Sequence, residues 1–218
     1  MRSGSGRSCQ ADAVSDDPVQ ETRATYDRVA ADYDRTTAGP DAAFVAFRTA
    51  FIDDVSSPVA DLGCGPGRDL TAMRDAGRAA IGVDLSTGML RRAVDAGVPV
   101  VRGDLRRPPI RPRSLGGIWS SAALLHVPRP DVPATLAAWR ALLKPGGHLG
   151  LSTSLGGGEG WELVPYAGEG PKGGELHRWF VHHDEEALLA LLAAAGFTIT
   201  SYTQRASHRT WAMIRATA

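Results

Sequence analysis

A glycine-rich turn after a short apolar run carries the clearest chemistry in this sequence. In "VADLGCGPGRDL", Asp61 precedes three alternating glycines, the first of which is Gly63, and Arg68 follows them. Such a turn can hold either a pyrophosphate or the amino-acid half of a sulfonium cofactor. A dinucleotide turn has a small residue where this chain has Arg68. Because Asp61 would repel a pyrophosphate and attract an ammonium group, the turn favours a cationic ligand.

Two more acids stand where further strands are expected to end. Asp84 closes "AAIGVD" about 20 residues after the turn, and Asp104 follows "VPVVRG". A carboxylate at Asp84 suits the ribose hydroxyls of either ligand. Asp104 can accept from an adenine amino group while the Leu105 backbone amide donates to a ring nitrogen. Together these residues indicate an adenosine-containing ligand.

The elements that must position these residues alternate between strand-like and helix-like segments. Strand-like runs are expected at 57–63, 79–86, 98–104, 115–122 and 148–155, with helix-like segments between them. This alternation is typical of an α/β fold with a doubly wound, mostly parallel sheet and helices on both faces. The runs "FTITSYTQ" and "TWAMIRAT" have no helix between them, so we expect an antiparallel hairpin at the sheet edge. Two more helices are predicted before the glycine turn, the second at 40–54.

Composition narrows the classes of partner. The 218 residues include 24 basic and 24 acidic side chains, so no overall charge attracts nucleic acid or an anionic membrane. The arginine-rich run 102–113 lacks interleaved aromatic residues and is interpreted as a solvated loop. The two cysteines form no disulfide framework, and no apolar run approaches the length of a membrane span. We expect residues 1–15 to be a disordered tail and 16–218 to be one cytoplasmic domain, a monomer or a homodimer.

Five ordered segments resemble the motifs of class I S-adenosylmethionine-dependent methyltransferases over roughly Tyr26 to the C-terminus. They are "VADLGCGPG", "IGVDLSTGML", "VRGDL", "GGIWSSAALLHVP" and "LLKPGGHLGLS". "YDRVAADYD" and "RWFVHHDEEALLALLAAAGF" resemble the small-molecule branch. The resemblance implies a seven-stranded sheet of order 3-2-1-4-5-7-6 with strand 7 antiparallel, S-adenosylmethionine as cofactor and S-adenosylhomocysteine as product. Relatives commonly read Phe-Asp-Gly-Ile-Trp where this chain has "LGGIW", and the missing acid lies away from the ligand-binding edge.

The same resemblance, with the reasoning above, assigns a cofactor-binding set. Tyr26 and Tyr33, two helical turns apart, either contact the cofactor carboxylate or only pack their helix. Arg68 either pairs with that carboxylate or is a solvated helix-start residue, Ser121 is expected beside the methionine arm, and Cys64 is a small turn residue rather than a nucleophile. The full set is Tyr26, Tyr33, Asp61, Gly63, Cys64, Gly65, Arg68, Asp84, Leu85, Met89, Gly103, Asp104, Leu105 and Ser121.

His126 follows the fourth strand, where substrate would meet cofactor. It is either a general base or substrate anchor, or a structural histidine. The glycine-rich segment 156–178 is predicted to be an active-site loop, and the helices within 16–54 an N-terminal lid. Substrate-binding residues are expected at Trp161, Tyr166, His177 and Arg178. The histidines near Arg178 lack the paired spacing of a zinc site, so no metal is expected.

The predicted function is in-line methyl transfer to an oxygen, nitrogen or carbon atom of a small molecule of specialised metabolism. Two alternatives stay open. An RNA or protein methyltransferase would present a basic face rather than a closed pocket. A cofactor-binding protein of this fold without transferase activity would keep the same acids and glycines.

Overall fold

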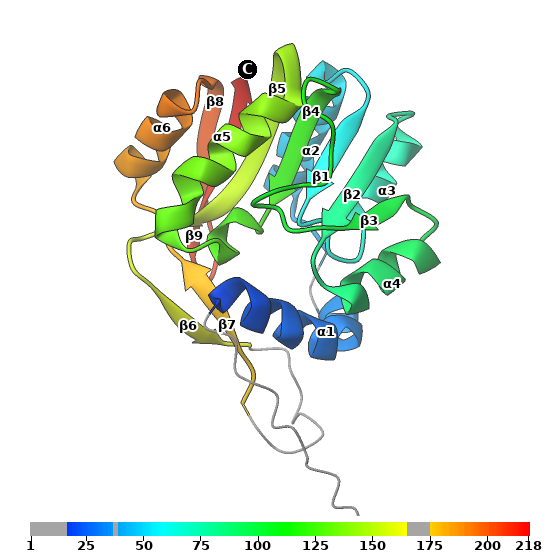
Figure 1. Cartoon of the computed structure of the whole chain (residues 1–218), viewed down its shortest axis with the longest axis vertical. Helices are drawn as coiled ribbons and strands as arrows, with labels where there is room; N and C mark the ends of the chain where they lie inside the picture. The colour runs from blue at the N-terminus through cyan, green and yellow to red at the C-terminus, as the bar shows by residue number, and fades with distance from the viewer. Residues whose placement is uncertain (1–16, 37–38, 165–174) are drawn as a thin grey trace, which may run out of the picture.

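The computed structural model describes residues 17–36, 39–164 and 175–218, so the predicted tail 1–15 and Tyr166 lie outside the described residues. The main sheet has seven strands in the order β3-β2-β1-β4-β5-β9-β8 (Figure 1). Only β9 runs antiparallel to its neighbours β5 and β8. The predicted order, its single antiparallel strand and the edge hairpin are therefore confirmed. The strands are β1 (Val59–Leu62), β2 (Ala80–Asp84), β3 (Val100–Arg102), β4 (Leu115–Ser121), β5 (Leu143–Leu155), β8 (Thr198–Ala206) and β9 (Thr210–Thr217).

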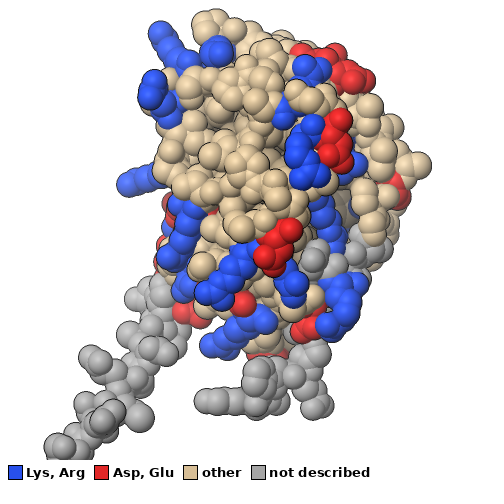
Figure 2. Space-filling model, turned by 90° about the vertical axis from the view of Figure 1, so that its right-hand side faces the viewer, with Lys and Arg blue, Asp and Glu red and all other residues tan. Residues whose placement is uncertain are grey.

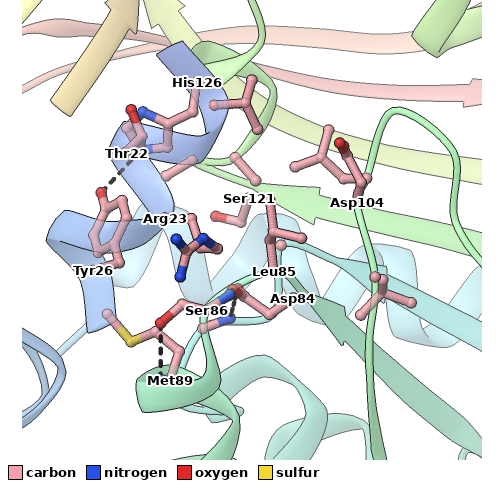
Figure 3. A pocket seen from close by; sticks show the side chains of 18 of the residues that line it. Thr22, Arg23, Tyr26, Asp84, Leu85, Ser86, Met89, Asp104, Ser121 and His126 are labelled. Atoms are coloured by element: carbon pink, nitrogen blue, oxygen red, sulfur yellow. Dashed lines mark hydrogen bonds between the residues drawn. The ribbon is translucent and has the colours of Figure 1, made fainter. Parts of the chain in front are cut away.

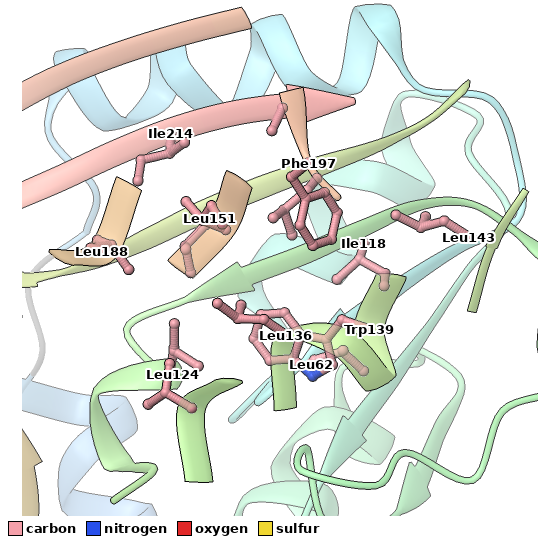
Figure 4. Packing of buried hydrophobic residues seen from close by; sticks show 14 of the residues in the cluster. Leu62, Ile118, Leu124, Leu136, Trp139, Leu143, Leu151, Leu188, Phe197 and Ile214 are labelled. Carbon is pink, nitrogen blue, oxygen red and sulfur yellow. The ribbon is translucent and has the colours of Figure 1, made fainter. Parts of the chain in front are cut away.

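Helices cover both faces of this sheet. Helices α5 and α6 lie on one face, with α2 behind the sheet (Figure 1). The first face carries the largest apolar cluster, in which Leu136 and Trp139 of α5 and Leu188 of α6 pack against strand residues such as Leu62 and Ile118 (Figure 4). The helices are α1 (Pro18–Thr36), α2 (Ala42–Asp54), α3 (Arg68–Asp75), α4 (Thr87–Asp95), α5 (Val132–Leu142) and α6 (Glu185–Ala194), with short 3₁₀ turns η1 (Leu124–His126) and η2 (Arg129–Asp131).

A packing contact explains why the fourth strand lacks the acid common in relatives. Gly116 lies against the segment before β1, where a Cβ atom would stand 2.0 Å from the Ser56 carbonyl oxygen. At the next residue, Gly117, a Cβ atom would stand 2.2 Å from a Val55 methyl group. Both distances are far below van der Waals contact, so a side chain at Gly116 would displace the Ser56 backbone and one at Gly117 would displace the Val55 side chain.

The segment 156–178, predicted as a loop, contains strand structure. Strand β6 (Glu159–Leu163) pairs antiparallel with β7 (His177–Val181) in a separate two-stranded sheet between β5 and α6. Exposure alternates along β6, as expected for a strand with one solvated face. The positive φ angles at Gly156, Gly157 and Gly158 turn the chain out of β5 into β6. The abundance of glycine in this segment obscured two short strands.

Helix α1 lies across the carboxyl ends of the parallel strands, between α4 and β7 (Figure 1). On the α4 side, the Asp27 carboxylate accepts from Ser86 Oγ at 2.8 Å and from the Gly88 amide at 2.9 Å. On the β7 side, Thr22 Oγ1 accepts from the Trp179 amide at 2.8 Å. Polar contacts therefore hold α1 from both sides. Within the described part of the chain, no helix has the length and apolar character needed to cross a membrane.

Candidate cofactor and substrate site

A pocket lies between α1 and the carboxyl ends of β1 to β4 (Figure 3). From the predicted set it is lined by Tyr26, Tyr33, Gly63, Gly65, Asp84, Leu85, Met89, Gly103, Asp104, Leu105, Ser121 and His126. Sequence reasoning missed Val19, Thr22 and Arg23 of α1, although helical spacing from Tyr26 puts all three on the same face. It also missed Ser86, which caps α4. The cavity volume is about 110 Å³, and α1 covers part of its opening.

The glycine turn is shaped by close contacts that only glycine permits. Gly63 has a φ of +82°, and a Cβ atom there would stand 2.2 Å from the Ala123 side chain. Gly67 has a φ of +84° and faces a Val98 methyl group in the same way, with a Cβ distance of 2.7 Å. The turn therefore packs its backbone against the segment after β4 at Gly63 and against the segment before β3 at Gly67, so a ligand beside Gly63 could meet backbone rather than a side chain.

Asp84 is fixed at the end of β2 by backbone donors. Its Oδ2 accepts from the Gly65 amide at 2.9 Å, and its Oδ1 accepts from the Ser86 amide at 2.8 Å. Burial raises the pKa of Asp84, while the amides of Ser86 and Gly65 act in the opposite direction. Each oxygen keeps a lone pair, so the carboxylate is oriented to accept two more hydrogen bonds from the pocket.

Asp61 is buried behind the turn, with 2% of its surface exposed. Among the residues that the structure describes, no hydrogen bond or salt bridge reaches its carboxyl group. Burial, and then the charges of Asp69 and Asp84, raise the pKa of Asp61 well above its usual value. A buried acid without a cation beside a pocket suits a positively charged group of a ligand.

Asp104 lines the pocket, but its carboxylate is bound by a neighbour. Arg106 Nη2 donates to Asp104 Oδ2 at 2.7 Å, and Arg106 Nε donates to the same oxygen at 3.0 Å. Arg106 also contacts Asp17, just before α1, at 2.8 Å and Asp131 at 3.2 Å. The interpretation of run 102–113 as a solvated loop is therefore wrong at Arg106, because its planar fork bridges three carboxylates. Asp104 keeps only part of its accepting capacity for a ligand.

Tyr26 and His126 form a hydrogen-bonded pair at the other end of the pocket. The His126 Nδ1 lies 2.6 Å from the Trp179 carbonyl oxygen and must donate to it, since a carbonyl only accepts. The His126 Nε2 therefore accepts from the Tyr26 hydroxyl, 2.9 Å away. Arg178 Nη1 donates to the same hydroxyl oxygen at 3.0 Å. Arg178, predicted as a substrate-binding residue, thus adjoins the pocket through Tyr26.

The environment of His126 changes its predicted role. Burial lowers the pKa of His126 to about 3, and the nearby charge of Arg178 acts in the same direction. An imidazole with this pKa and two occupied nitrogens is a weak base at neutral pH. Of the two predicted alternatives, this environment favours a structural histidine, which holds the Tyr26 hydroxyl at the pocket wall.

Tyr33 and Arg68 lie side by side near the glycine turn. The Arg68 guanidinium carbon is 5.8 Å from the centre of the Tyr33 ring, and the Tyr33 and Tyr26 rings meet edge to face at 5.9 Å. Burial, followed by the neighbouring Tyr26, raises the pKa of Tyr33 to about 12, so its hydroxyl stays a neutral donor. Cys64 is buried, and burial raises the pKa of its thiol, which argues against a nucleophile.

The remaining predicted substrate residues lie on the small sheet. Trp161 is 47% exposed and packs against Trp179 with ring centres 5.3 Å apart, so it does not line the cavity. His177 is exposed, and its carbonyl accepts from Thr25 Oγ1 at 2.6 Å. His182 lies between Ser154 and a carboxylate rather than beside another histidine. The described residues contain no cluster of metal-binding side chains.

Comparisons with known proteins agree with this geometry. Residues 59–147 match a family model described as a methyltransferase domain, and no curated protein matches the chain. The predicted resemblance to methyltransferases is confirmed for residues 59–147, the segment that this family model matches.

Solved structures of low sequence identity share the fold. The 1,6-didemethyltoxoflavin-N1-methyltransferase of Burkholderia thailandensis is 21% identical, with a TM-score of 0.68 over 95% of this chain and 92% of that one. The magnesium protoporphyrin IX methyltransferase of Synechocystis is 18% identical, with a TM-score of 0.69 over 95% and 99% of the two chains. An S-adenosylmethionine-dependent methyltransferase of Mesorhizobium loti is 22% identical, with a TM-score of 0.64 over 82% and 98%.

Proposed function

We propose that this methyltransferase acts on a small molecule by in-line methyl transfer. The observation that carries the proposal is the enclosure of the pocket, in which α1 covers the carboxyl ends of β1 to β4 and is tied to α4 and β7. The cavity of about 110 Å³ under α1 is partly open to solvent, and typical ligand pockets have several hundred Å³. A cover of this kind suits a small acceptor better than a folded macromolecule.

The described residues fit S-adenosylmethionine at two positions. Asp84, fixed by the amides of Gly65 and Ser86, would accept from the ribose hydroxyls. Asp61, buried without a cation, would meet the ammonium or sulfonium charge. Such a carboxylate gains from a bound cation because it is desolvated before the ligand arrives.

Candidate residues for the adenine and the carboxylate of the cofactor have less support. Asp104 and the Leu105 amide would read adenine, with Asp104 also held by Arg106. Tyr33 and Arg68 would hold the cofactor carboxylate, and Ser121 would line the methionine arm. The cofactor supplies an activated methyl group on a neutral leaving group.

The protein then aligns the acceptor, which is the main requirement of an in-line displacement. The bond from Tyr26 to neutral His126 holds a hydroxyl at the wall of the pocket, and α1 excludes water. Since His126 is a weak base, an acceptor that is already deprotonated fits this site best.

The alternatives have less support. The face shown in Figure 2 carries arginine side chains with acidic side chains between several of them, rather than an unbroken basic surface. This distribution gives no support to RNA binding on that face. A protein of this fold without transferase activity would bind the cofactor but release no product.

The proposal is tested by calorimetry with S-adenosylhomocysteine, followed by a panel of small acceptors in which release of S-adenosylhomocysteine is measured. We expect saturable cofactor binding and turnover with at least one small acceptor. Cofactor binding without turnover of small acceptors, but with turnover of RNA or protein, would overturn the substrate class. A cytoplasmic location and a monomeric or homodimeric state are part of the proposal, and light scattering tests the latter.

A further inference from the structure

Two arginines share one buried aromatic ring beside the pocket. Phe180 of β7 is 2% exposed, and the Arg209 guanidinium carbon lies 4.3 Å from its ring centre. The Arg178 guanidinium carbon lies 5.1 Å from the same centre. The ring of His126 meets Phe180 edge to face at 5.5 Å. A ring face stabilises a guanidinium but does not neutralise its charge.

The acid near these arginines does not satisfy Arg209. Glu162 Oε2 accepts from Arg209 Nη2 at 3.2 Å, while Glu162 Oε1 lies 2.6 Å from His182 Nε2. Arg209 Nη1 is buried and has no acceptor among the described residues. A buried charged donor without an acceptor is costly, and an anion at this place would remove the cost.

This cluster adjoins the end of the pocket where the acceptor would lie. Arg178 donates to the Tyr26 hydroxyl, which lines the pocket and bonds to His126. The charge of Arg209 also contributes, after burial and Arg178, to the lowered pKa of His126. The positive field of both arginines therefore reaches the pocket wall.

We propose that Arg209, together with Arg178, forms a subsite for an anionic group of the methyl acceptor, with a carboxylate as the matching chemistry. This inference rests on the proposed function. A guanidinium fork matches the two oxygens of a carboxylate, and the aromatic ring holds the fork in place. The acceptor class is accordingly a small carboxylic acid or another compact organic anion. The alternative occupant of this subsite is the carboxylate at the amino-acid end of the cofactor, which Tyr33 and Arg68 are proposed to bind instead.

The probe is sodium acetate, titrated at constant ionic strength into the full chain saturated with S-adenosylhomocysteine. Arginine Nε–Hε signals are followed by NMR, and acetamide is the neutral control. We expect saturable shifts at Arg209 and Arg178 with acetate and none with acetamide. Arg209→Gln should weaken acetate binding at least about tenfold, because a charge-assisted hydrogen bond is lost. Arg215→Gln, on β9 and paired with Asp54 instead, should leave it unchanged.

Several outcomes would overturn the proposal. Shifts that do not saturate in the wild type, or equal acetate affinity in Arg209→Gln, mean that no anion subsite exists. Acetate binding that occurs only without S-adenosylhomocysteine assigns the arginines to the cofactor carboxylate. Acetate binding at Arg209 in a chain that fails to bind S-adenosylhomocysteine contradicts the proposed function, and it overturns the assignment of the anion site to a methyl acceptor. If Arg209→Gln is poorly folded, Arg209→Lys replaces it in the test. This variant keeps the charge without the guanidinium fork and should bind acetate with intermediate affinity.

Discussion

Replacement of Asp61 by asparagine should stabilise the protein without ligand and weaken its cofactor binding. Asp61 is 2% exposed and has no salt bridge among the described residues, so its charge is desolvated without compensation. Its pKa in the folded state is raised by burial, whereas the unfolded chain has the ordinary value near 4. The folded state therefore binds the proton more tightly, and stability falls as the pH rises from about 4 through the raised pKa. Asparagine does not ionise, so Asp61→Asn removes this loss of stability at high pH.

The magnitude follows from linkage. At a pH above both pKa values, each unit by which the folded-state pKa of Asp61 exceeds its unfolded value lowers the free energy of unfolding by about 1.4 kcal/mol. For a domain of this size, 1 kcal/mol corresponds to about 2–4 °C in Tm. We therefore expect Asp61→Asn to raise the Tm of the ligand-free protein at neutral pH by at least about 3 °C. Loss of a charged partner for the cofactor ammonium group should weaken S-adenosylhomocysteine roughly 10- to 150-fold.

Calorimetry and thermal unfolding measure both effects on one preparation. Cofactor affinity in the wild type should fall as the pH is lowered below the raised pKa of Asp61, because the bound cation favours the charged carboxylate. Titrations in buffers of different ionisation enthalpy should detect proton release in that range, and Asp61→Asn should lose it. Asp75→Asn, at the exposed end of α3, is the control for a charge change away from the pocket. Unchanged affinity together with a lowered Tm would refute the reasoning.

Three further predictions concern the pocket and its cover. Asp84→Ala should weaken S-adenosylhomocysteine at least about tenfold by calorimetry, because each charge-assisted bond contributes about 1.5–3 kcal/mol, and equal affinity in a folded variant would refute the ribose assignment. His126→Ala should lower kcat less than about tenfold. The pH–rate profile of the wild type should have no limb near 6.5, because the pKa of His126 is about 3. A limb near 6.5 that the variant loses would show that His126 is a general base. Asp27→Ala should speed hydrogen exchange in α1 and raise the cofactor dissociation rate, since Asp27 ties α1 to Ser86 and Gly88, and equal exchange would mean that these bonds do not hold the cover.

The order of the sheet followed from the resemblance of the ordered motifs to a known family, and its parallel strands followed from the alternation along the chain. Alternating apolar runs and helical segments specify parallel strands, and parallel strands bring residues such as Asp84 and Ser121 to one edge whatever the packing details. The acid before the glycine turn predicted a cationic ligand because charge and spacing are local properties of the chain. The edge hairpin followed equally from the absence of a helix between its two strands.

Only the tertiary structure decided how these residues are partnered. Arg106 belongs by sequence to a polar loop, yet Asp17 and Asp131 from other segments join the neighbouring Asp104 around it. His126 carries an ordinary imidazole, and its weak basicity comes from burial, from Arg178 of the small sheet and from Arg209 of the β8–β9 turn, both more than 50 residues away in sequence. The pairing of Arg178 and Arg209 on Phe180 depends in the same way on contacts between β7 and the β8–β9 turn. Burial and long-range contacts set pKa values and charge balance, and neither has a local signal in the sequence.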